Sequence, residues 1–317
     1  MSKTIIPSEI KTPWSNIPVI SYKKSDSPVV WLTACSHGDE VGGVAVIHEV
    51  FKTIKEKMVK GSLYAFPMIN PIAFDSGTRM VKGEDLNRSF PGSETGSIAK
   101  KTANHVFSTI MKSNPDIVID LHNDWTHSIP YVIVDPIPGR ISNEAYKLSK
   151  FIARGVGFVV VEETIDKLDN STVLEWKKTL SGSLITNGVP ALTIELGESR
   201  VINEENVKMG TEAIYNVLSK LGMISNPSGF IHPSVSSIGN EMLYYSGRPR
   251  SSTSGGMLIF KVKPGEVIKK GQILAKVYDI LGKEIEIIRS ESSGVILGHA
   301  EVSVAKPETP LIAIATK

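Results

Sequence analysis

Two side chains that commonly bind zinc, an imidazole and a carboxylate, lie three residues apart in the segment Ser36-His37-Gly38-Asp39-Glu40. If the chain turns helical here, His37 and Glu40 project side by side, and their nitrogen and oxygen atoms suit zinc at roughly 2.0–2.2 Å. The segment directly follows the apolar run 28–34, which we predict to be a buried strand. Because α/β folds place ligands in the loops after such strands, the pair predicts two ligands of a metal site.

A third ligand is expected elsewhere in the chain, since catalytic zinc commonly takes three protein ligands and keeps one position for water. Of the seven histidines, His122 fits best, because it ends the predicted strand 116–122. Asp120 precedes it by two residues, so both side chains lie on one face of the strand and Asp120 could accept the outer N–H of a zinc-binding imidazole. His127, in the following loop, stays an alternative third ligand.

The order of elements indicates the fold class. We predict strands at 28–34, 63–70, 116–122, 131–134, 158–161 and 191–195, and helices at 40–58, 97–112 and 204–221. Strands separated by helices indicate an α/β fold with a mixed sheet flanked by helices. Beyond residue 222 the chain is turn-rich with only short strands, which is typical of a small all-β barrel or sandwich. We therefore expect a catalytic domain over residues 1–225 and a small C-terminal β domain over residues 226–317.

Composition is that of an ordinary soluble globular protein: 317 residues, 41% hydrophobic and 21% charged. A net charge of only +2 without a basic stripe argues against a nucleic-acid binder, and no apolar run approaches the ~18 residues of a membrane span. The single cysteine, Cys35, forms no intrachain disulfide, and the first residues lack the apolar run of a secretory signal. We expect a cytoplasmic protein, and the sequence leaves its oligomeric state open, a homo-oligomer included.

Four segments, in this order, resemble the succinylglutamate desuccinylase/aspartoacylase family, whose members are relatives of the zinc metallocarboxypeptidases. They are His37-Gly38-Asp39-Glu40; Asn70-Pro71 with Thr78-Arg79 and the run Asp85-Leu86-Asn87-Arg88-Ser89-Phe90-Pro91-Gly92; Asp120-Leu121-His122; and Thr193-Ile194-Glu195-Leu196-Gly197. The run from Asp85 is the most specific of them. The resemblance implies a zinc carboxypeptidase-like fold and one Zn²⁺ per chain, held by His37, Glu40 and His122.

The resemblance also implies roles for four further residues. Glu195 would act as general base and then general acid, moving a proton from the attacking water to the leaving amine. Arg79 would stabilise the oxyanion that forms on the carbonyl. Asn87 and Arg88 would bind a substrate carboxylate, because a guanidinium matches it in bidentate fashion. Alternatively, Arg88 braces its own loop through Asp85.

The C-terminal part resembles the small β domain appended to this family, with a strand pattern similar to biotinyl and lipoyl modules. Lys283 lies at a turn but lacks the flanking residues of a modified carrier lysine, so we expect it to stay unmodified. The domain is expected to shape or shield the mouth of the active site, or to mediate assembly. Family members often use a tyrosine that closes over the substrate, and Tyr244 and Tyr245 both fall near the domain junction.

These features predict a zinc-dependent amidohydrolase, or deacylase, that cleaves the amide bond of a small N-acyl amino acid or a related carboxylate-bearing amide. We expect a small-molecule substrate, and neither nucleic acid nor a membrane as partner. Two alternatives stay open. A metallocarboxypeptidase acting on short peptides would use the same chemistry, and a non-catalytic metal- or ligand-binding protein would use the β domain for recognition.

Overall fold

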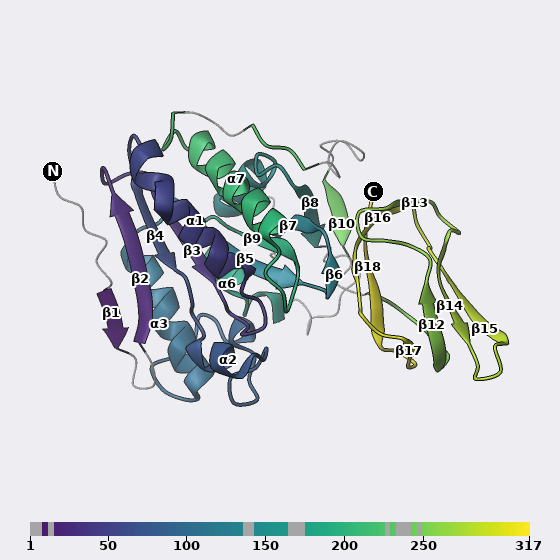
Figure 1. Cartoon of the computed structure of the whole chain (residues 1–317). Coiled ribbons are helices and arrows are strands. Elements are labelled where there is room, and N and C mark those ends of the chain that lie inside the picture. Colours follow the sequence, from purple (N-terminus) through teal and green to yellow (C-terminus); the bar gives the residue numbers. More distant parts are fainter. Residues whose placement is uncertain are drawn as a thin grey trace.

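The computed structural model describes residues 8–11, 16–135, 143–163, 175–225, 229–232, 242–245 and 249–317. Residue 226, the expected first residue of the β domain, lies outside these ranges. A large mixed sheet flanked by helices forms the N-terminal part, and antiparallel strands form the C-terminal part (Figure 1). The α/β class and the mixed sheet are therefore confirmed. No helix within the described ranges has the length and apolar character needed to cross a membrane.

Parallel strands occupy the centre of the N-terminal sheet. Its members are β1 (Ser8–Lys11), β2 (Asn16–Lys23), β3 (Val29–Ala34), β4 (Ser62–Phe66), β5 (Ile117–Asp124), β7 (Pro130–Val134), β8 (Val159–Glu163) and β9 (Ala191–Glu198). Their spatial order is β1-β2-β4-β3-β5-β9-β7-β8. β3 pairs in parallel with β4 and β5, and β5 with β9, whereas β2 and β7 run antiparallel to β4 and β9. The ends of β3, β5 and β9 therefore lie side by side.

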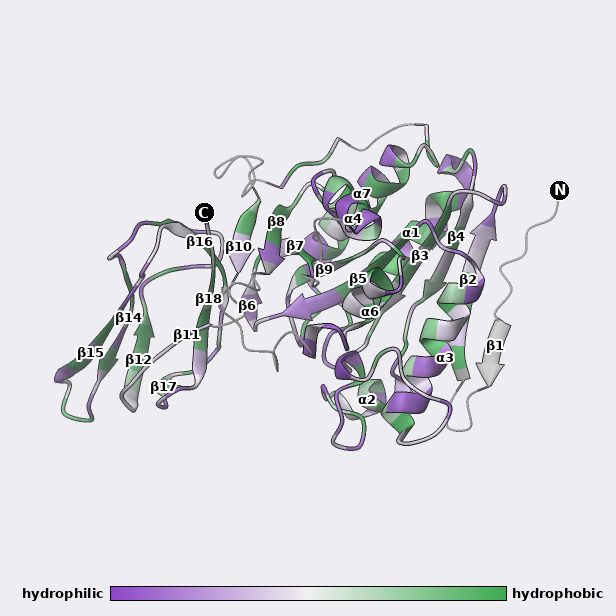
Figure 2. Cartoon of the chain, turned by 180° about the vertical axis from the view of Figure 1, so that it is seen from behind, coloured by the Kyte–Doolittle hydropathy of each residue, from purple (hydrophilic) through white to green (hydrophobic). Residues whose placement is uncertain are grey.

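Helices cover both faces of this sheet. They are α1 (Gly42–Lys57), α2 (Pro71–Ser76), the 3₁₀ turn η1 (Leu86–Arg88), α3 (Ile98–Lys112), α4 (Glu144–Ala153), α6 (Leu180–Thr186) and α7 (Glu204–Lys220). α1 and α7 pack against each other on one face (Figure 1), and α3, α4 and α6 lie on the other (Figure 2). The apolar side chains between these layers form one core that runs from Ile17 to Ile224, and Figure 2 shows hydrophobic colouring along β3 and β4.

The C-terminal strands form two sheets, one of which continues the N-terminal sheet. They are β10 (Leu243–Tyr245), β11 (Arg250–Ser251), β12 (Gly256–Phe260), β13 (Val267–Ile268), β14 (Ile273–Tyr278), β15 (Glu284–Arg289), β16 (Gly294–His299), β17 (Val304–Ala305) and β18 (Pro310–Thr316). β10 pairs in parallel with β8 and antiparallel with β18, so the large sheet runs on through β18 and β16 to β13. β15, β14, β12 and β17 make a separate antiparallel sheet, and the two sheets share a core that includes Leu274 and Leu311.

A third apolar cluster joins the two parts of the chain. It combines Tyr131 and Val161 of the N-terminal sheet with Leu243 of β10 and Leu297 of β16. β6 (His127–Ser128) adds to this junction, since it pairs with β16. This cluster and the pairing with β8 hold β10 against the N-terminal sheet.

Helix α1 lies close to the sheet because small residues occur where it crosses β3 and β5. A Cβ atom at Gly43 would lie 2.7 Å from the Leu121 Cβ and 2.9 Å from the Ala34 Cβ, closer than packed carbon atoms come.

Gly43→Ala is therefore expected to destabilise the protein by about 1–3 kcal/mol, because α1 must move away from the sheet despite the better helix propensity of alanine. Gly255→Ala is the control, since its nearest neighbour would lie 3.7 Å away, and it should change stability by less than about 0.5 kcal/mol. Urea unfolding measures both variants, and equal midpoints would contradict the close packing.

Candidate active site

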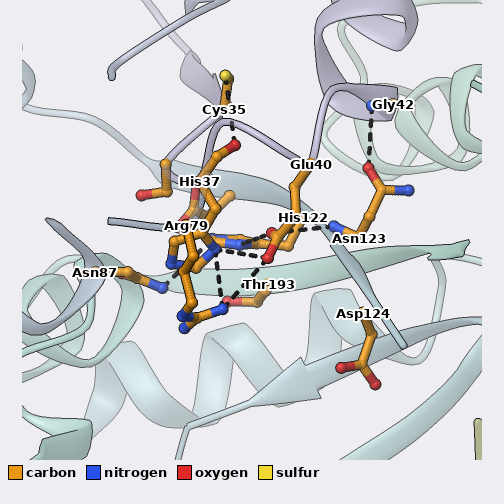
Figure 3. A network of polar contacts seen from close by, with 12 residues as sticks. Cys35, His37, Glu40, Gly42, Arg79, Asn87, His122, Asn123, Asp124 and Thr193 are labelled. Atoms are coloured by element: carbon orange, nitrogen blue, oxygen red, sulfur yellow. Dashed lines mark hydrogen bonds and ion pairs between the residues drawn. The ribbon is translucent and has the colours of Figure 1, made fainter. Parts of the chain in front are cut away.

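Three buried side chains meet near the carboxyl ends of β3 and β5. His37 and Glu40 lie in the loop between β3 and α1, and His122 lies in β5. Their candidate ligand atoms all fall within 4.8 Å of one another, and the Nδ1 atoms of both histidines lie 2.7 Å from oxygens of the Glu40 carboxylate (Figure 3). His127, the alternative third ligand, lies instead on β6, where its ring packs beside His299.

The outer nitrogens of the two imidazoles also face carboxylates. His37 Nε2 lies 3.1 Å from Asp85 Oδ1, and His122 Nε2 lies 2.9 Å from Asp120 Oδ2. A carboxylate on the outer nitrogen orients a histidine ring and favours a proton on that nitrogen, so Nδ1 is the atom that each ring would offer to a metal beside Glu40. Two imidazole nitrogens and one carboxylate, oriented in this way, are a donor set that suits zinc.

The pKa values of the central groups follow from their burial and mutual contact. Burial alone would raise the pKa of Glu40, but the His37 and His122 imidazoles lower it further than burial raises it. Burial would lower the pKa of His122, whereas the Asp120 and Glu40 carboxylates raise it well above its usual value. Glu40 is thus held in its ionised form, which is the form that binds a metal.

The loop that carries His37 is fastened to α2 by the Asn70-Pro71 motif. Asn70 Nδ2 donates to the Ser36 carbonyl at 2.8 Å, and its Oδ1 accepts from the Ala73 N–H at 3.2 Å. The Gly38 N–H donates to the Thr78 carbonyl at 2.8 Å. A Cβ at Gly38 would lie 1.8 Å from the Ala73 oxygen, so only glycine fits at this position between His37 and Glu40.

Arg79 reaches the same cluster from the segment after α2. Its Nε and Nη2 lie 3.0 Å and 2.9 Å from Asp85 Oδ2, and its Nη1 lies 3.4 Å from Glu40 Oε1. The guanidinium therefore faces the central carboxylate while it is anchored by a second one.

Asn87 and Arg88 lie on the 3₁₀ turn η1 beside this cluster. Asn87 Nδ2 lies 3.4 Å from His122 Nε2, and its Oδ1 accepts from the Leu180 N–H at 2.9 Å. Arg88 Nη1 donates to the Asn87 carbonyl at 2.8 Å. Asp85 forms its ion pair with Arg79, and the Arg88 charge also helps to lower the pKa of the Asp85 carboxyl.

Glu195 lies on β9 directly beside His122 of β5. Its Oε2 atom is buried and accepts no hydrogen bond from the described residues. Burial, and then the nearby Asp124 carboxylate, raise the pKa of Glu195 well above its usual value. A carboxylate with a raised pKa beside a candidate metal site is suited to general base catalysis.

A cavity of about 200 Å³ opens in front of these groups. It is also lined by Thr193 and by residues that the sequence did not single out, namely Asn123, Asp124, Tyr131, Ile133, Asp135, Trp176, Thr179 and Ser181. Tyr245 lines the cavity as well, whereas Tyr244, its neighbour on β10, is 44% exposed. Asp124 and Asp135 both lie at strand ends, the signal that identified His122, and the same signal could have found them.

Two of these acids, the buried Asp135 and the partly buried Asp124, lie against hydroxyl groups. Asp135 is 4% exposed and accepts a hydrogen bond from the Ser181 hydroxyl, which itself lies 3.1 Å from Thr193 Oγ1. Asp124 accepts a hydrogen bond from the Tyr131 hydroxyl. Burial is the main reason that the pKa of each acid is raised to about 6.

Comparison with known proteins gives the following similarities. The succinylglutamate desuccinylase/aspartoacylase catalytic domain matches residues 26–221. An N-alpha-acetyl-L-2,4-diaminobutyric acid deacetylase of Halomonas elongata is 26% identical over 295 residues, which cover 88% of this chain and 80% of that protein.

Solved structures share the fold of both parts of the chain. The product-bound ectoine utilization protein EutE (DoeB) of Ruegeria pomeroyi superposes with a TM-score of 0.78 at 20% identity, covering 95% of this chain and 89% of that one. A succinylglutamate desuccinylase/aspartoacylase of Rhodobacter sphaeroides superposes with a TM-score of 0.79 at 21% identity, covering 95% and 90%. The shared fold therefore extends beyond the matched catalytic domain into the C-terminal strands.

Asp135 gives a testable dependence of stability on pH. Its pKa is about 6 in the folded protein and 3.8 ordinarily, so between these values the folded state binds more protons than the unfolded state, and stability falls as pH rises. Asp135→Asn removes this dependence and keeps an oxygen for Ser181. We expect the variant to exceed the wild type in free energy of unfolding by about 1–3 kcal/mol at pH 7.5, and the two to converge near pH 4.

Chemical denaturation at both pH values measures this difference. Glu144→Gln, which removes an acid whose side chain is 83% exposed, is the control and should show no such convergence. A constant difference between Asp135→Asn and wild type over the whole range would contradict the raised pKa.

Proposed function

Because the chain belongs to the succinylglutamate desuccinylase/aspartoacylase family, we propose that it is a zinc-dependent deacylase that hydrolyses the amide bond of a small N-acyl amino acid or a related carboxylate-bearing amide. The observation that carries the proposal is the convergence of His37, Glu40 and His122 in a cavity that also holds Arg79 and Glu195. The name of the Halomonas elongata relative describes deacetylation of such an amide, which supports the substrate class.

One zinc ion per chain would be held by His37 Nδ1, His122 Nδ1 and the Glu40 carboxylate. Asp85 and Asp120 would orient the two imidazoles through their outer nitrogens. Zinc bound here supplies a Lewis acid that polarises the amide carbonyl and acidifies water. The nitrogen ligands favour zinc over magnesium or calcium, which prefer oxygen.

The proton transfers are assigned to Glu195. Its carboxylate takes a proton from the water that attacks the carbonyl carbon, and returns that proton to the amide nitrogen as the carbon–nitrogen bond breaks. The products are a carboxylate and a free amine. Burial and the raised pKa support this role, since they make Glu195 a stronger base than an exposed glutamate. Arg79, with Nη1 turned toward the cluster, would stabilise the negative charge on the carbonyl oxygen.

Arg88 and Asn87 are proposed to bind the substrate carboxylate. Both side chains line the cavity, and the Arg88 charge lowers the pKa of Asp85 and of Asp135, which places a guanidinium charge close to this part of the wall. Tyr245 would contact the substrate from the β10 side of the cavity. A small cavity with a wall supplied by the C-terminal part favours small amides over peptides; parallel assays with N-acyl amino acids and blocked dipeptides separate the proposal from a metallocarboxypeptidase.

The domain organisation, cellular location and assembly of the enzyme are also part of this proposal. We propose a zinc carboxypeptidase-like catalytic domain over residues 1–225 and a β domain over residues 226–317 that completes the cavity through β10. A cytoplasmic location is supported by the single, buried thiol of Cys35. Assembly of the chain into a homo-oligomer is compatible with this arrangement.

The metal site predicts about one zinc ion per purified chain. Removal of the ion by a chelator should abolish hydrolysis, and added zinc should restore it. His122→Ala should lower zinc content and affinity at least about tenfold, whereas the control variant His127→Ala should leave both unchanged. Metal analysis after dialysis measures the content, and a fully active chain without a divalent ion would overturn the proposal.

Glu195→Gln should lower kcat by about 10²–10⁴-fold, because the amide cannot accept the proton, while zinc content and KM stay close to the wild type. Glu144→Gln serves as the control, since its side chain is exposed on α4. Steady-state kinetics on an N-acetyl amino acid measures the effect. Turnover that survives Glu195→Gln would remove this residue from the mechanism, and tight ligand binding without hydrolysis by the wild type would favour a binding protein.

A further inference from the structure

Among the described residues that line the cavity, negative side chains outnumber positive ones. The carboxylates are Glu40, Asp124, Asp135 and Glu195, and the guanidinium groups are those of Arg79 and Arg88. Arg79 is already engaged with Glu40 and with Asp85 behind it. Within the described ranges, no lysine or arginine forms an ion pair with Asp124, Asp135 or Glu195.

The proposed reaction accounts for two of these carboxylates. Glu40 is a metal ligand and Glu195 is the general base. Asp124 follows His122 by two residues and is held by the Tyr131 hydroxyl. Neither metal binding nor the proposed proton transfers require Asp135.

The position of Asp135 nevertheless suits a side chain that binds substrate. It follows β7, is 4% exposed and lines the cavity, while its Oδ2 accepts from the Ser181 hydroxyl. Burial raises the pKa of Asp135, and the nearby Arg88 charge offsets this only in part. A buried anion with one hydroxyl partner is costly unless a cation joins it, and at neutral pH a group with this pKa is an anion.

We propose that Asp135 binds an ammonium group of the substrate, so that the enzyme acts on monoacylated diamino acids. The amine half of such a substrate carries a carboxylate for Arg88 and a free ammonium for Asp135, two opposite charges that match the two opposite charges of the cavity wall. Asp135 accepts a hydrogen bond from the ammonium and keeps its contact with Ser181. This inference rests on the proposed deacylase function and narrows its substrate class.

Three substrates that differ in the group at the end of a short unbranched side chain test the charge preference. In N-acetyl-2,4-diaminobutyrate, N-acetylnorvaline and N-acetylglutamate the side chain ends in an ammonium, a methyl and a carboxylate group. Both monoacetyl isomers of the diamino acid are assayed with zinc-loaded enzyme. We expect kcat/KM for the better isomer to exceed that for N-acetylnorvaline by about 10–100-fold, as for a buried charge-assisted hydrogen bond, and N-acetylglutamate to be the poorest.

Asp135→Asn should remove this preference. Its kcat/KM for the ammonium substrate should fall at least about tenfold, mainly through KM, while the value for N-acetylnorvaline stays within about threefold. Glu144→Gln removes one negative charge from an exposed position and should change neither value. Equal losses on the ammonium and methyl substrates would show that Asp135 only supports the structure, and would overturn the inference.

Product binding separates this inference from the proposed function. Calorimetry with 2,4-diaminobutyrate and with norvaline should show at least about tenfold tighter binding of the diamino acid to the wild type, and similar affinities with Asp135→Asn. Efficient hydrolysis of all three amides would leave the deacylase intact and reject the ammonium site. Absence of hydrolysis with every amide, together with selective binding of the diamino acid, would reject the deacylase and keep the site.

Discussion

The contact on which the site depends is the Glu40 carboxylate set between the Nδ1 atoms of His37 and His122. Those three groups come from two places in the chain, and the parallel pairing of β3 with β5 brings them together. The pairing register puts Ala34 level with Leu121, so the loop that follows Ala34 begins level with His122. A shift by one residue would turn His122 to the other face of the sheet and dissolve the cluster.

Around this contact, each partner is held by a second polar group. Asp120 meets His122 and also accepts from the Thr33 hydroxyl at 2.6 Å, so a neighbouring strand fixes the carboxylate that fixes the imidazole. On the other side Asp85 serves both His37 and Arg79. The orientation of the candidate ligands and that of the candidate oxyanion arginine are therefore coupled through one carboxylate, and an arrangement of this kind is preorganised before any substrate arrives.

The sequence was most informative where the chemistry is local. The spacing of His37 and Glu40 and the strand-end position of His122 were enough to assemble the cluster, because strand ends in parallel sheets lie along one edge. The strand Asn16–Lys23 and the short helix Leu180–Thr186 were not predicted, since brief polar-containing segments carry little periodicity. Which tyrosine of β10 faces the cavity was also open. Because side chains alternate along a strand, Tyr244 and Tyr245 are expected to point in opposite directions. Only the pairing of β10 with β8 and β18 decides which of the two faces the cavity.

Long-range burial explains the rest of what the sequence could not supply. Asp135 looks like any polar residue after a strand until β9 and α6 close over it and Ser181 becomes its partner. Once buried, it costs stability at neutral pH, and so does Glu195, whose Oε2 has no hydrogen-bond donor among the described residues. Charges held in this way are retained in a fold when they do work on a ligand. A cavity in which Arg79 pairs with Glu40 while Arg88 and Asp135 lie on the wall without an ion pair to a described residue suits a molecule that carries charges of both signs.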